Sequence, residues 1–478
     1  MEVDPQTFYK YLKADFPHAP TINQDILLQQ LCTFLISKNN DTVFLLKGYA
    51  GTGKTTSIGT LVKNLWRLKM KSVQLAPTGR AAKVISNYSQ SPAQTIHRKI
   101  YFPKKESGGS ISFTLQRNKH RNTLFIVDEA SMVPDTVSDS KLFENGSLLD
   151  DLMFYVYSGH NCKLLLIGDN AQLPPVGLEL SPALDDQLLG SRFGKEVMSI
   201  ELDEVMRQAE NSGILKNATR IRQFLSDEMF TDFRFDLSGQ NDTERLIDGH
   251  DILHALEESY REHGNEGTVL IVRSNKRANL YNQQIRSRIL FKEEEVSPGD
   301  YLMVVKNNYF WLDAKSDAGF IANGDIVEIL EIFSIKELYG FRFAEVKVQM
   351  TDYPNLKPFE TVLLLDTLTS ETPSLRYEDS NRLYQEVMKD YAEEKSKYRK
   401  FLKVKNNKYF NALQVKFSYA ITCHKSQGGQ WNTIFVEQPY LPEGPNKDYL
   451  RWLYTAVTRA QKNLYLIGFK NDMFLSEL

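Results

Sequence analysis

The sequence predicts an α/β fold built from parallel sheets and helices, and three observations support this. The segments 42–48 and 162–169 are continuous apolar runs that lead into a glycine, which is typical of strands buried on both faces. A third apolar segment, 123–130, ends in carboxylates. Helical stretches at 54–69 and 80–88 lie between these strands. This order predicts an open sheet whose ligands bind at the carboxyl ends of the strands.

The chain is long enough for at least two domains. It has 478 residues, 42% of them hydrophobic, whereas single cores stop growing at roughly 250 to 300 residues. A strand and helix over 267–290 and a strand at 462–469 predict a second α/β domain. Between them, short strands at 298–308, 323–332 and 343–350 favour an inserted β-barrel over one large loop, since long structureless stretches are uncommon in compact domains.

Composition narrows the class of protein. A formal net charge of -2 means that any nucleic-acid binding would come from a local groove and not from a polycationic body. The three cysteines, Cys32, Cys162 and Cys423, form no CxxC pair, which indicates a reducing compartment and no disulfide framework. The N-terminus is acidic and polar, unlike a signal peptide, and no apolar run approaches the roughly 20 residues that cross a bilayer. We therefore expect a cytoplasmic protein without membrane contacts.

Residues 48–56, GYAGTGKTT, match the phosphate-loop pattern without a mismatch. The glycines let backbone N–H groups turn toward phosphates, Lys54 can reach the β and γ oxygens, and the Thr55 hydroxyl can bind Mg²⁺. The pattern follows a predicted strand and opens a predicted helix, as this mechanism requires. The expected ATP contacts in this segment are Gly48, Ala50, Gly51, Thr52, Gly53, Lys54, Thr55 and Thr56.

The ends of the next two strands supply the complementary groups. Asp128 is expected to hold Mg²⁺ through its water shell, while Glu129 polarises the attacking water; the alternative is an ordinary acidic strand end. One strand later, Asp169 and Gln172 should lie near the γ-phosphate. An uncharged amide can orient water or sense the phosphate without adding charge, which suits Gln172 to a sensor role.

These blocks resemble motifs I, II and III of superfamily 1 helicases, in the branch that contains RecD, Dda and the Pif-like enzymes. The resemblance extends to motifs Ia, Ib, IV, V and VI at 76–85, 94–101, 202–208, 421–431 and 454–461. It implies two RecA-like domains, with a β-hairpin insertion in the first and an SH3-like β-barrel insertion in the second. The implied boundaries are 1–205 with a hairpin at 98–122, then 206–290 together with 412–478, and an insertion at 291–411.

The resemblance also implies roles for residues that the spacing alone does not assign. Arg207 and Arg459 are expected to be arginine fingers, since arginine stays charged and forks onto phosphate oxygens; without the motifs, each would be read as a surface arginine. Gln24 resembles the glutamine that recognises adenine, and Gly428 is expected to contact the nucleotide.

The track for a nucleic-acid strand is expected to consist mostly of short, uncharged groups, which would suit a motor that must release the backbone at every step. By resemblance the contacts are Pro77, Thr78, Gly79, Arg80, Thr95, His97, Ser274, Asn275, Thr422, His424 and Ser426. The resemblance also implies that the hairpin splits the duplex, which makes Tyr101 and Phe102 candidates for the wedge; the alternative is a decorated surface loop.

The segment 421–431, ITCHKSQGGQW, first suggests a metal site or a nucleophile with its base. No second cysteine or histidine lies at ligand spacing, and neighbours on an extended chain point to opposite faces. We therefore expect Thr422, His424 and Ser426 to share one face toward DNA, while Lys425, Gln427 and Gly428 lead toward the nucleotide. Elsewhere, five apolar or aromatic residues have near-helical spacing, and we expect their side chains to pack against the rest of the protein. They are Tyr384, Val387, Tyr391, Tyr398 and Leu402.

Together, the resemblance implies a monomeric, ATP- and Mg²⁺-dependent DNA helicase that translocates 5′ to 3′ on single-stranded DNA. Its substrate would be a duplex with a 5′ single-strand tail, and a replication or repair protein remains open as a partner. Polarity comes wholly from the resemblance. The alternatives are an RNA or RNA:DNA helicase, and an ATP-gated clamp that binds single strands without unwinding.

Overall fold

The structure of the protein is a computed structural model that describes residues 3–105, 111–135, 147–204, 212–239, 241–313, 316 and 318–475. It contains two parallel sheets, a closed β-barrel and a two-stranded hairpin. The predicted fold class, an α/β protein with a hairpin and a barrel insertion, is confirmed.

The first sheet has six parallel strands in the order β3-β2-β6-β7-β1-β8. They are β1 Thr42–Gly48, β2 Lys71–Ala76, β3 Ala93–Thr95, β6 Arg121–Val127, β7 His160–Gly168 and β8 Glu196–Leu202. Side chains alternate between the two faces. Phe44 and Leu46 pack with the helices α1 Pro5–Ala14, α2 Ile22–Ile36 and α3 Lys54–Asn64. Val43 and Leu45 face α5 Ile96–Ile100, α6 Leu148–Tyr157 and α7 Asp186–Phe193.

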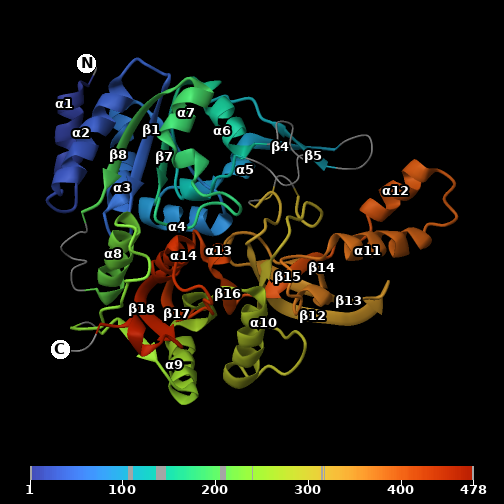
Figure 1. Cartoon of the computed structure of the whole chain (residues 1–478). Coiled ribbons are helices and arrows are strands. Elements are labelled where there is room, and N and C mark those ends of the chain that lie inside the picture. Colours follow the sequence, from blue (N-terminus) through green and yellow to red (C-terminus); the bar gives the residue numbers. More distant parts are fainter. Residues whose placement is uncertain are drawn as a thin grey trace.

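The second sheet has five parallel strands in the order β16-β10-β17-β18-β9. They are β9 Thr243–Leu246, β10 Thr268–Val272, β16 Ala420–Thr422, β17 Trp431–Glu437 and β18 Ala460–Ile467. One face packs on α8 Gly213–Ser226 and α14 Lys447–Val457. The other packs on α9 Gly249–Gly267 and α10 Asn275–Gln284. The helix α4 Gly79–Ser89 lies at the junction of the two halves (Figure 1).

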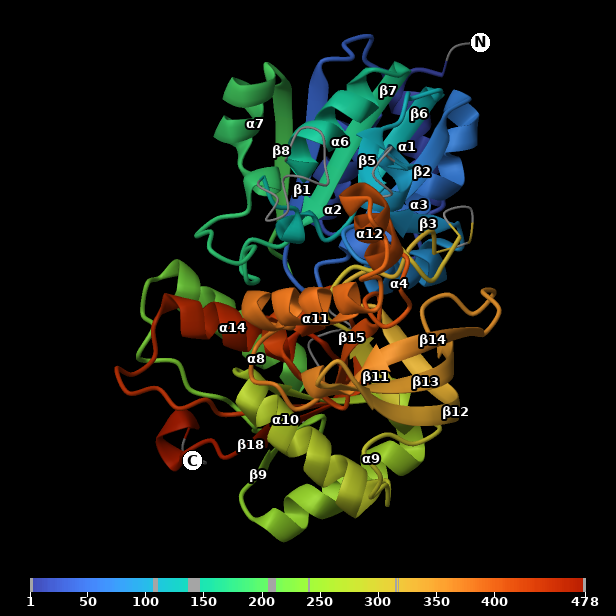
Figure 2. The ribbon, with the colours of Figure 1, turned by 90° about the vertical axis from the view of Figure 1, so that its right-hand side faces the viewer.

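The barrel is inserted between α10 and β16. Its strands are β11 Tyr301–Val304, β12 Ile326–Leu338, β13 Phe341–Met350, β14 Phe359–Leu364 and β15 Leu413–Phe417. The barrel interior and one face of the second sheet share a single apolar cluster, so the two pack as neighbours (Figure 2). The closing strand β15 begins after residue 411, so the barrel continues past the expected end of the insertion.

The charged segment after β14 is not one helical stripe. It forms α11 Tyr377–Lys389 and α12 Lys397–Lys405. Tyr384, Val387 and Tyr391 pack against the barrel, whereas Tyr398 is 48% exposed. The expected packing stripe is therefore wrong in its second half, because the helix ends between the two groups of aromatic residues.

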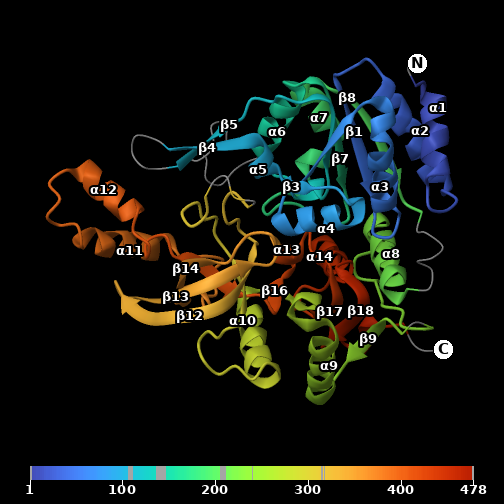
Figure 3. The same ribbon diagram turned by 180° about the vertical axis from the view of Figure 1, so that it is seen from behind.

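The predicted hairpin consists of β4 Tyr101–Lys105 and β5 Ile111–Leu115, paired antiparallel. Tyr101 is buried, packs edge-on against Phe113 and donates its hydroxyl to Asp151 at 2.6 Å. The prediction that Tyr101 acts as a wedge is therefore wrong, because its ring belongs to the core. Phe102 is 62% exposed. The hairpin and the α11–α12 pair extend from the same side of the molecule (Figure 3).

None of the helices in the described ranges has the length and apolar character needed to cross a membrane.

Candidate functional site

The phosphate loop connects the carboxyl end of β1 to the first turn of α3, as predicted. Gly51 and Gly53 have φ of 78° and 82°, backbone conformations that other residues adopt only with strain. Lys54 Nζ donates to the carbonyl oxygens of Gly48 and Tyr49 at 2.6 and 2.7 Å. The loop amides and the ammonium group therefore gather at a helix N-terminus, which favours anions.

Asp128 lies beside this loop at the end of β6. Its carboxylate accepts hydrogen bonds from the Tyr88 hydroxyl and from the Glu129 N–H, the latter at 2.8 Å. Burial raises the pKa of Asp128, and the neighbouring charge of Glu129 raises that pKa further. The Tyr88 hydroxyl also interacts with the Thr55 side chain. The two predicted Mg²⁺ ligands, Thr55 and Asp128, thus both meet Tyr88.

Asp169 and Gln172 follow the neighbouring strand β7. Asp169 is buried and accepts hydrogen bonds from the Ala171 N–H at 2.9 Å and the Tyr454 hydroxyl at 2.7 Å. Burial raises the pKa of Asp169, against the opposing effect of the Lys54 charge. The buried Gln172 Oε1 has no hydrogen-bond partner among the residues that the structure describes, so this acceptor is free to bind a water or substrate group.

Arg459 reaches this site from the second half of the molecule. It directly follows Thr458 at the end of α14, and its side chain is buried. Arg459 Nη1 lies 3.5 Å from Glu129 Oε1, and Nε donates to the Thr455 carbonyl at 3.0 Å. The predicted base and one predicted finger therefore form an ion pair between the two halves. The other predicted finger, Arg207, lies outside the described residues.

Gln24 is fully buried near the start of α2. Its amide Nε2 donates to the Thr52 carbonyl at 3.0 Å, and its Oε1 accepts the Thr21 N–H at 3.1 Å. Both ends of the predicted adenine-binding amide are thus engaged within the protein, where they tie the start of α2 to the phosphate loop.

The segment after β16 corrects the expected extended chain. Cys423–Ser426 form a helical turn, α13. Ser426 is fully buried and donates its hydroxyl to the Cys423 carbonyl at 2.7 Å, while His424 is exposed. The predicted common face of Thr422, His424 and Ser426 is therefore wrong, because a helical turn separates residues that an extended strand would align.

The double glycine that follows lies directly against α4. Gly428 has a φ of +73°, and a Cβ there would lie 2.9 Å from Ala81 Cβ and 3.2 Å from Thr78 Oγ1. The Arg80 guanidinium lies 4.7 Å from the Trp431 ring centre. Gly428, predicted to contact nucleotide, therefore contacts the start of α4, and no bulkier residue fits between the two halves at this point.

Several candidate DNA contacts cap helices. Thr78, Thr95 and Ser274 are the N-cap residues of α4, α5 and α10, and each hydroxyl accepts a backbone N–H at 3.2 to 3.3 Å. Thr422 occupies the same position before α13. Pro77 and Gly79 flank Thr78, the cap of α4. Burial lowers the pKa of His97, another candidate DNA contact, to about 4. The Asn275 amide donates to the Glu371 carbonyl at 3.2 Å.

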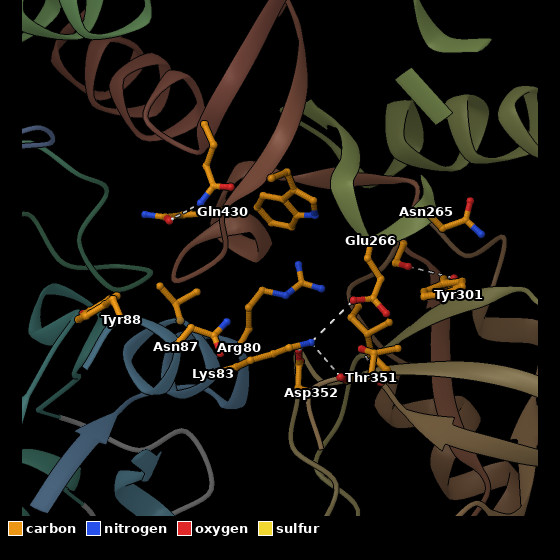
Figure 4. Close-up of a pocket in the computed structure, with 15 residues that line it drawn as sticks. Arg80, Lys83, Asn87, Tyr88, Asn265, Glu266, Tyr301, Thr351, Asp352 and Gln430 are labelled. Carbon is orange, nitrogen blue, oxygen red and sulfur yellow. Dashed lines mark hydrogen bonds and ion pairs between the residues drawn. The ribbon is translucent and has the colours of Figure 1, made fainter. Parts of the chain in front are cut away.

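A cavity of about 530 Å³ lies where α4, the barrel and the second sheet meet (Figure 4). Arg80, Lys83 and Tyr88 line it from α4. Lys83 Nζ donates to the Thr351 carbonyl at 2.9 Å and lies 3.7 Å from Glu266. One helix thus carries the capping Thr78 at its start, contacts to the barrel along its length, and Tyr88 beside Asp128 near its end.

Three residues of this site were missed by sequence reasoning, Tyr88, Tyr454 and Thr455, and the partner of Gln427 was not foreseen. Thr455 Oγ1 accepts the Leu173 N–H at 2.9 Å, and Gln427 Nε2 donates to the Leu173 carbonyl at 2.6 Å. Gln427, Tyr454 and Thr455 fall inside recognised motif segments, but nothing in the sequence marks their partners, which lie hundreds of residues away.

Two family models match the chain. The model described as an AAA domain matches residues 33–178, and the UvrD-like helicase C-terminal domain matches residues 417–467. The first segment contains the phosphate loop, Asp128 and Gln172. The second contains the α13 turn and Arg459.

Curated relatives match most of the chain. An uncharacterised protein of Acanthamoeba polyphaga mimivirus is 24% identical, over 92% of this chain and 98% of its own length. The ATP-dependent RecD2 DNA helicase of Deinococcus radiodurans is 28% identical, over 89% of this chain and 46% of its own length. The ATP-dependent DNA helicase dda of Enterobacteria phage T4 is 24% identical, over 88% of this chain and 93% of its own length.

Among solved structures, one of two coordinating Pif1 helicases at forked double-stranded DNA aligns with 96% of this chain and 94% of that chain. The TM-score is 0.47 and the sequence identity 17%.

Proposed function

We propose that this chain is a superfamily 1 helicase of the RecD, Dda and Pif-like branch, which acts as a monomer and uses ATP and Mg²⁺ to move 5′ to 3′ along single-stranded DNA and unwind duplex. The observation that carries the proposal is the ion pair of Glu129 with Arg459 at 3.5 Å. It joins the proposed hydrolytic base on the first sheet to a cation from the second, beside a phosphate loop. RecD2 and dda, both named as ATP-dependent DNA helicases, support DNA as the track.

The phosphates of ATP would bind at the N-terminus of α3. Lys54 would exchange its bonds to the Gly48 and Tyr49 carbonyls for bonds to β and γ oxygens, which a charged donor favours. Thr55 and Asp128 suit Mg²⁺ because this ion prefers oxygen ligands. The raised pKa of Asp128 beside Glu129 fits a site that gains from a bound cation. When bound, Mg²⁺ would neutralise charge on the transferred phosphoryl group.

Hydrolysis requires that an attacking water be oriented and that transition-state charge be stabilised. Glu129 would accept the water's hydrogen bond, and the free Gln172 Oε1 could hold the same water from a second direction. Arg459, now paired with Glu129, would turn to the γ-phosphate as the two halves close. The lost ion pair would be replaced by a bidentate contact to phosphate.

Movement along DNA would follow from the same closure. Thr78 on the first half and Ser274 on the second cap the helices α4 and α10, whose N-termini favour phosphate groups. Opening and closing the cleft would change the spacing between these contacts. The exposed Phe102 on the hairpin remains the candidate wedge.

A strand-displacement assay with 5′-tailed and 3′-tailed duplexes, with and without ATP, tests the proposal. We expect ATP-dependent displacement from the 5′-tailed substrate alone. Displacement from the 3′-tailed substrate would reverse the proposed polarity. ATP-dependent binding without displacement would favour a clamp. Preferential competition by single-stranded RNA over DNA would favour an RNA helicase.

A further inference from the structure

Tyr454 connects α14 to two parts of the proposed nucleotide site on the other half of the molecule. Its hydroxyl accepts the Ala50 N–H at 3.0 Å and donates to Asp169 Oδ2 at 2.7 Å. The side chain is 1% exposed. One hydroxyl group therefore joins the phosphate loop, the end of β7 and the helix that leads to Arg459.

The Ala50 N–H lies within the loop whose backbone donors cradle phosphates in proteins with this pattern. The charge of Lys54, the side chain that reaches the β and γ oxygens in such loops, acts on Asp169. The hydrogen-bonded chain is thus close to the position of the terminal phosphates. A phosphate oxygen in the loop would compete with the Tyr454 hydroxyl for the Ala50 donor.

We propose that Tyr454 is a positioning residue of the phosphate loop, whose hydroxyl holds the Ala50 N–H until a nucleotide phosphate takes that donor. Nucleotide binding would then break the direct bond between the loop and α14. The inference rests on the proposed function, since it assumes that the loop binds a nucleotide.

The contacts around Tyr454 explain how releasing one bond could matter. Thr455 and Gln427 hold the backbone of Leu173, and Arg451 Nη1 donates to the Glu179 carbonyl at 2.7 Å. The bonds from Thr455 and Arg451 hold α14 against the first half, and neither of them uses a phosphate-loop donor. The Tyr454 bond differs because its partner is a loop donor that phosphate would use, so it can report occupancy without separating the two halves.

The test compares Tyr454→Phe with Tyr449→Phe in the full chain. Tyr449 lies on the same helix and is also fully buried, but its hydroxyl donates to Gln438 Oε1 at 2.8 Å, away from the phosphate loop. Each variant loses one hydroxyl and keeps its ring in the core. The three measurements are amide hydrogen exchange of the nucleotide-free protein, ADP titration by calorimetry, and KM for ATP from steady-state hydrolysis.

We expect the phosphate-loop peptide of Tyr454→Phe to exchange faster than that of the wild type, and its ADP dissociation constant to fall by about threefold to tenfold, the worth of one competing hydrogen bond. KM for ATP should fall with it, while Tyr449→Phe matches the wild type in all three quantities. Unchanged loop exchange, or an ADP affinity that is equal or weaker in Tyr454→Phe, would overturn the inference.

Failure of the proposed function and failure of the variant to fold can each be distinguished from failure of the inference. A wild-type chain that does not bind ADP would contradict the proposed function, whatever the variant does. If Tyr454→Phe does not fold, Tyr454→Met removes the same hydroxyl with a flexible apolar side chain that can adapt to the core. Its loop amides should again exchange faster than those of Tyr449→Phe, and unchanged exchange in that variant would also overturn the inference.

Discussion

At the scale of single residues, several charged groups of the site already bind one another, whereas Gln172 Oε1 has no partner among the described residues. Lys54 binds loop carbonyls, Tyr88 binds Asp128, and Arg459 pairs with Glu129. Buried polar and charged groups are costly without partners. Substrate binding at this site must therefore exchange hydrogen bonds, which makes each partner a place where nucleotide and protein compete.

Lys54→Ala should abolish DNA-stimulated ATP hydrolysis, because it removes the only charged donor that the loop pattern places on the β and γ oxygens. We expect a loss of about a hundredfold or more, the typical cost of removing one transition-state donor. Phosphate release in the presence of single-stranded DNA measures it. The control is Lys63→Ala, an exposed lysine in the last turn of the same helix. Turnover retained by Lys54→Ala would refute its placement.

Asp325, which precedes β12, offers a test of buried charge. It is 2% exposed and accepts the Ala322 N–H at 2.7 Å. Burial raises its pKa to about 8, with Asp352 adding to the rise and Arg80 opposing it. Because the folded protein holds this proton more tightly than the unfolded chain, the carboxyl's contribution to stability is full below about pH 4 and is lost as the pH rises toward 8.

Asp325→Asn should therefore raise the thermal midpoint by a few degrees at pH 8 and leave it unchanged at pH 4, since the amide stays neutral and can still accept the Ala322 N–H. Differential scanning calorimetry at both pH values measures this. An equal shift at the two pH values would indicate that the effect is not one of protonation.

At the scale of elements, sequence reasoning succeeded where burial leaves a long pattern. The strands at 42–48 and 162–169 were predicted correctly because strands covered on both faces are continuously apolar. It failed at α13, since the four-residue turn Cys423–Ser426 is too short to show a helical period. It also failed at Tyr101, because strand alternation does not reveal that the buried Tyr101 hydroxyl meets Asp151 of α6.

The first glycine of the double glycine, Gly428, lies directly against α4. Gly428→Ala should weaken this contact, because the new methyl group would lie 2.9 Å from Ala81 Cβ. We expect DNA-stimulated hydrolysis to fall several-fold while unstimulated hydrolysis changes little. The loss should arise because α4 carries both Thr78 and the Tyr88 contact to Asp128.

Gly444→Ala is a matched control for that substitution. Gly444 has a φ of +78°, close to the +73° of Gly428, but a Cβ there would meet nothing within 4 Å. Both variants carry a similar backbone strain of roughly 1–2 kcal/mol, and only Gly428→Ala adds the clash. Equal DNA stimulation in the two variants would show that the α4 contact does not couple the halves.

At the scale of the whole molecule, the resemblance to the RecD, Dda and Pif-like branch is confirmed by the family models and by the relatives RecD2 and dda. The pairings between the halves were beyond sequence reasoning. Ala50 and Tyr454 are 404 residues apart in the chain, and no local pattern specifies which residues meet across a cleft. The motifs therefore located the two halves of the site but not the bonds that join them.

Arg459→Ala tests whether the two halves act together in hydrolysis. Removing the guanidinium takes away the proposed transition-state cation and leaves Glu129 without its partner at 3.5 Å. Since an arginine finger stabilises mainly charge that develops during transfer, kcat should fall by about a hundredfold or more. The ATP dissociation constant should change by less than about fivefold.

The matched control is Arg451→Ala, because Arg451 lies on the same α14 and also crosses to the first half, through the Glu179 carbonyl at 2.7 Å. If the finger acts on the phosphate, Arg451→Ala should keep most of the wild-type kcat. An equal loss in both variants would instead assign Arg459 to holding the halves together, and an unchanged kcat in Arg459→Ala would reject its role altogether.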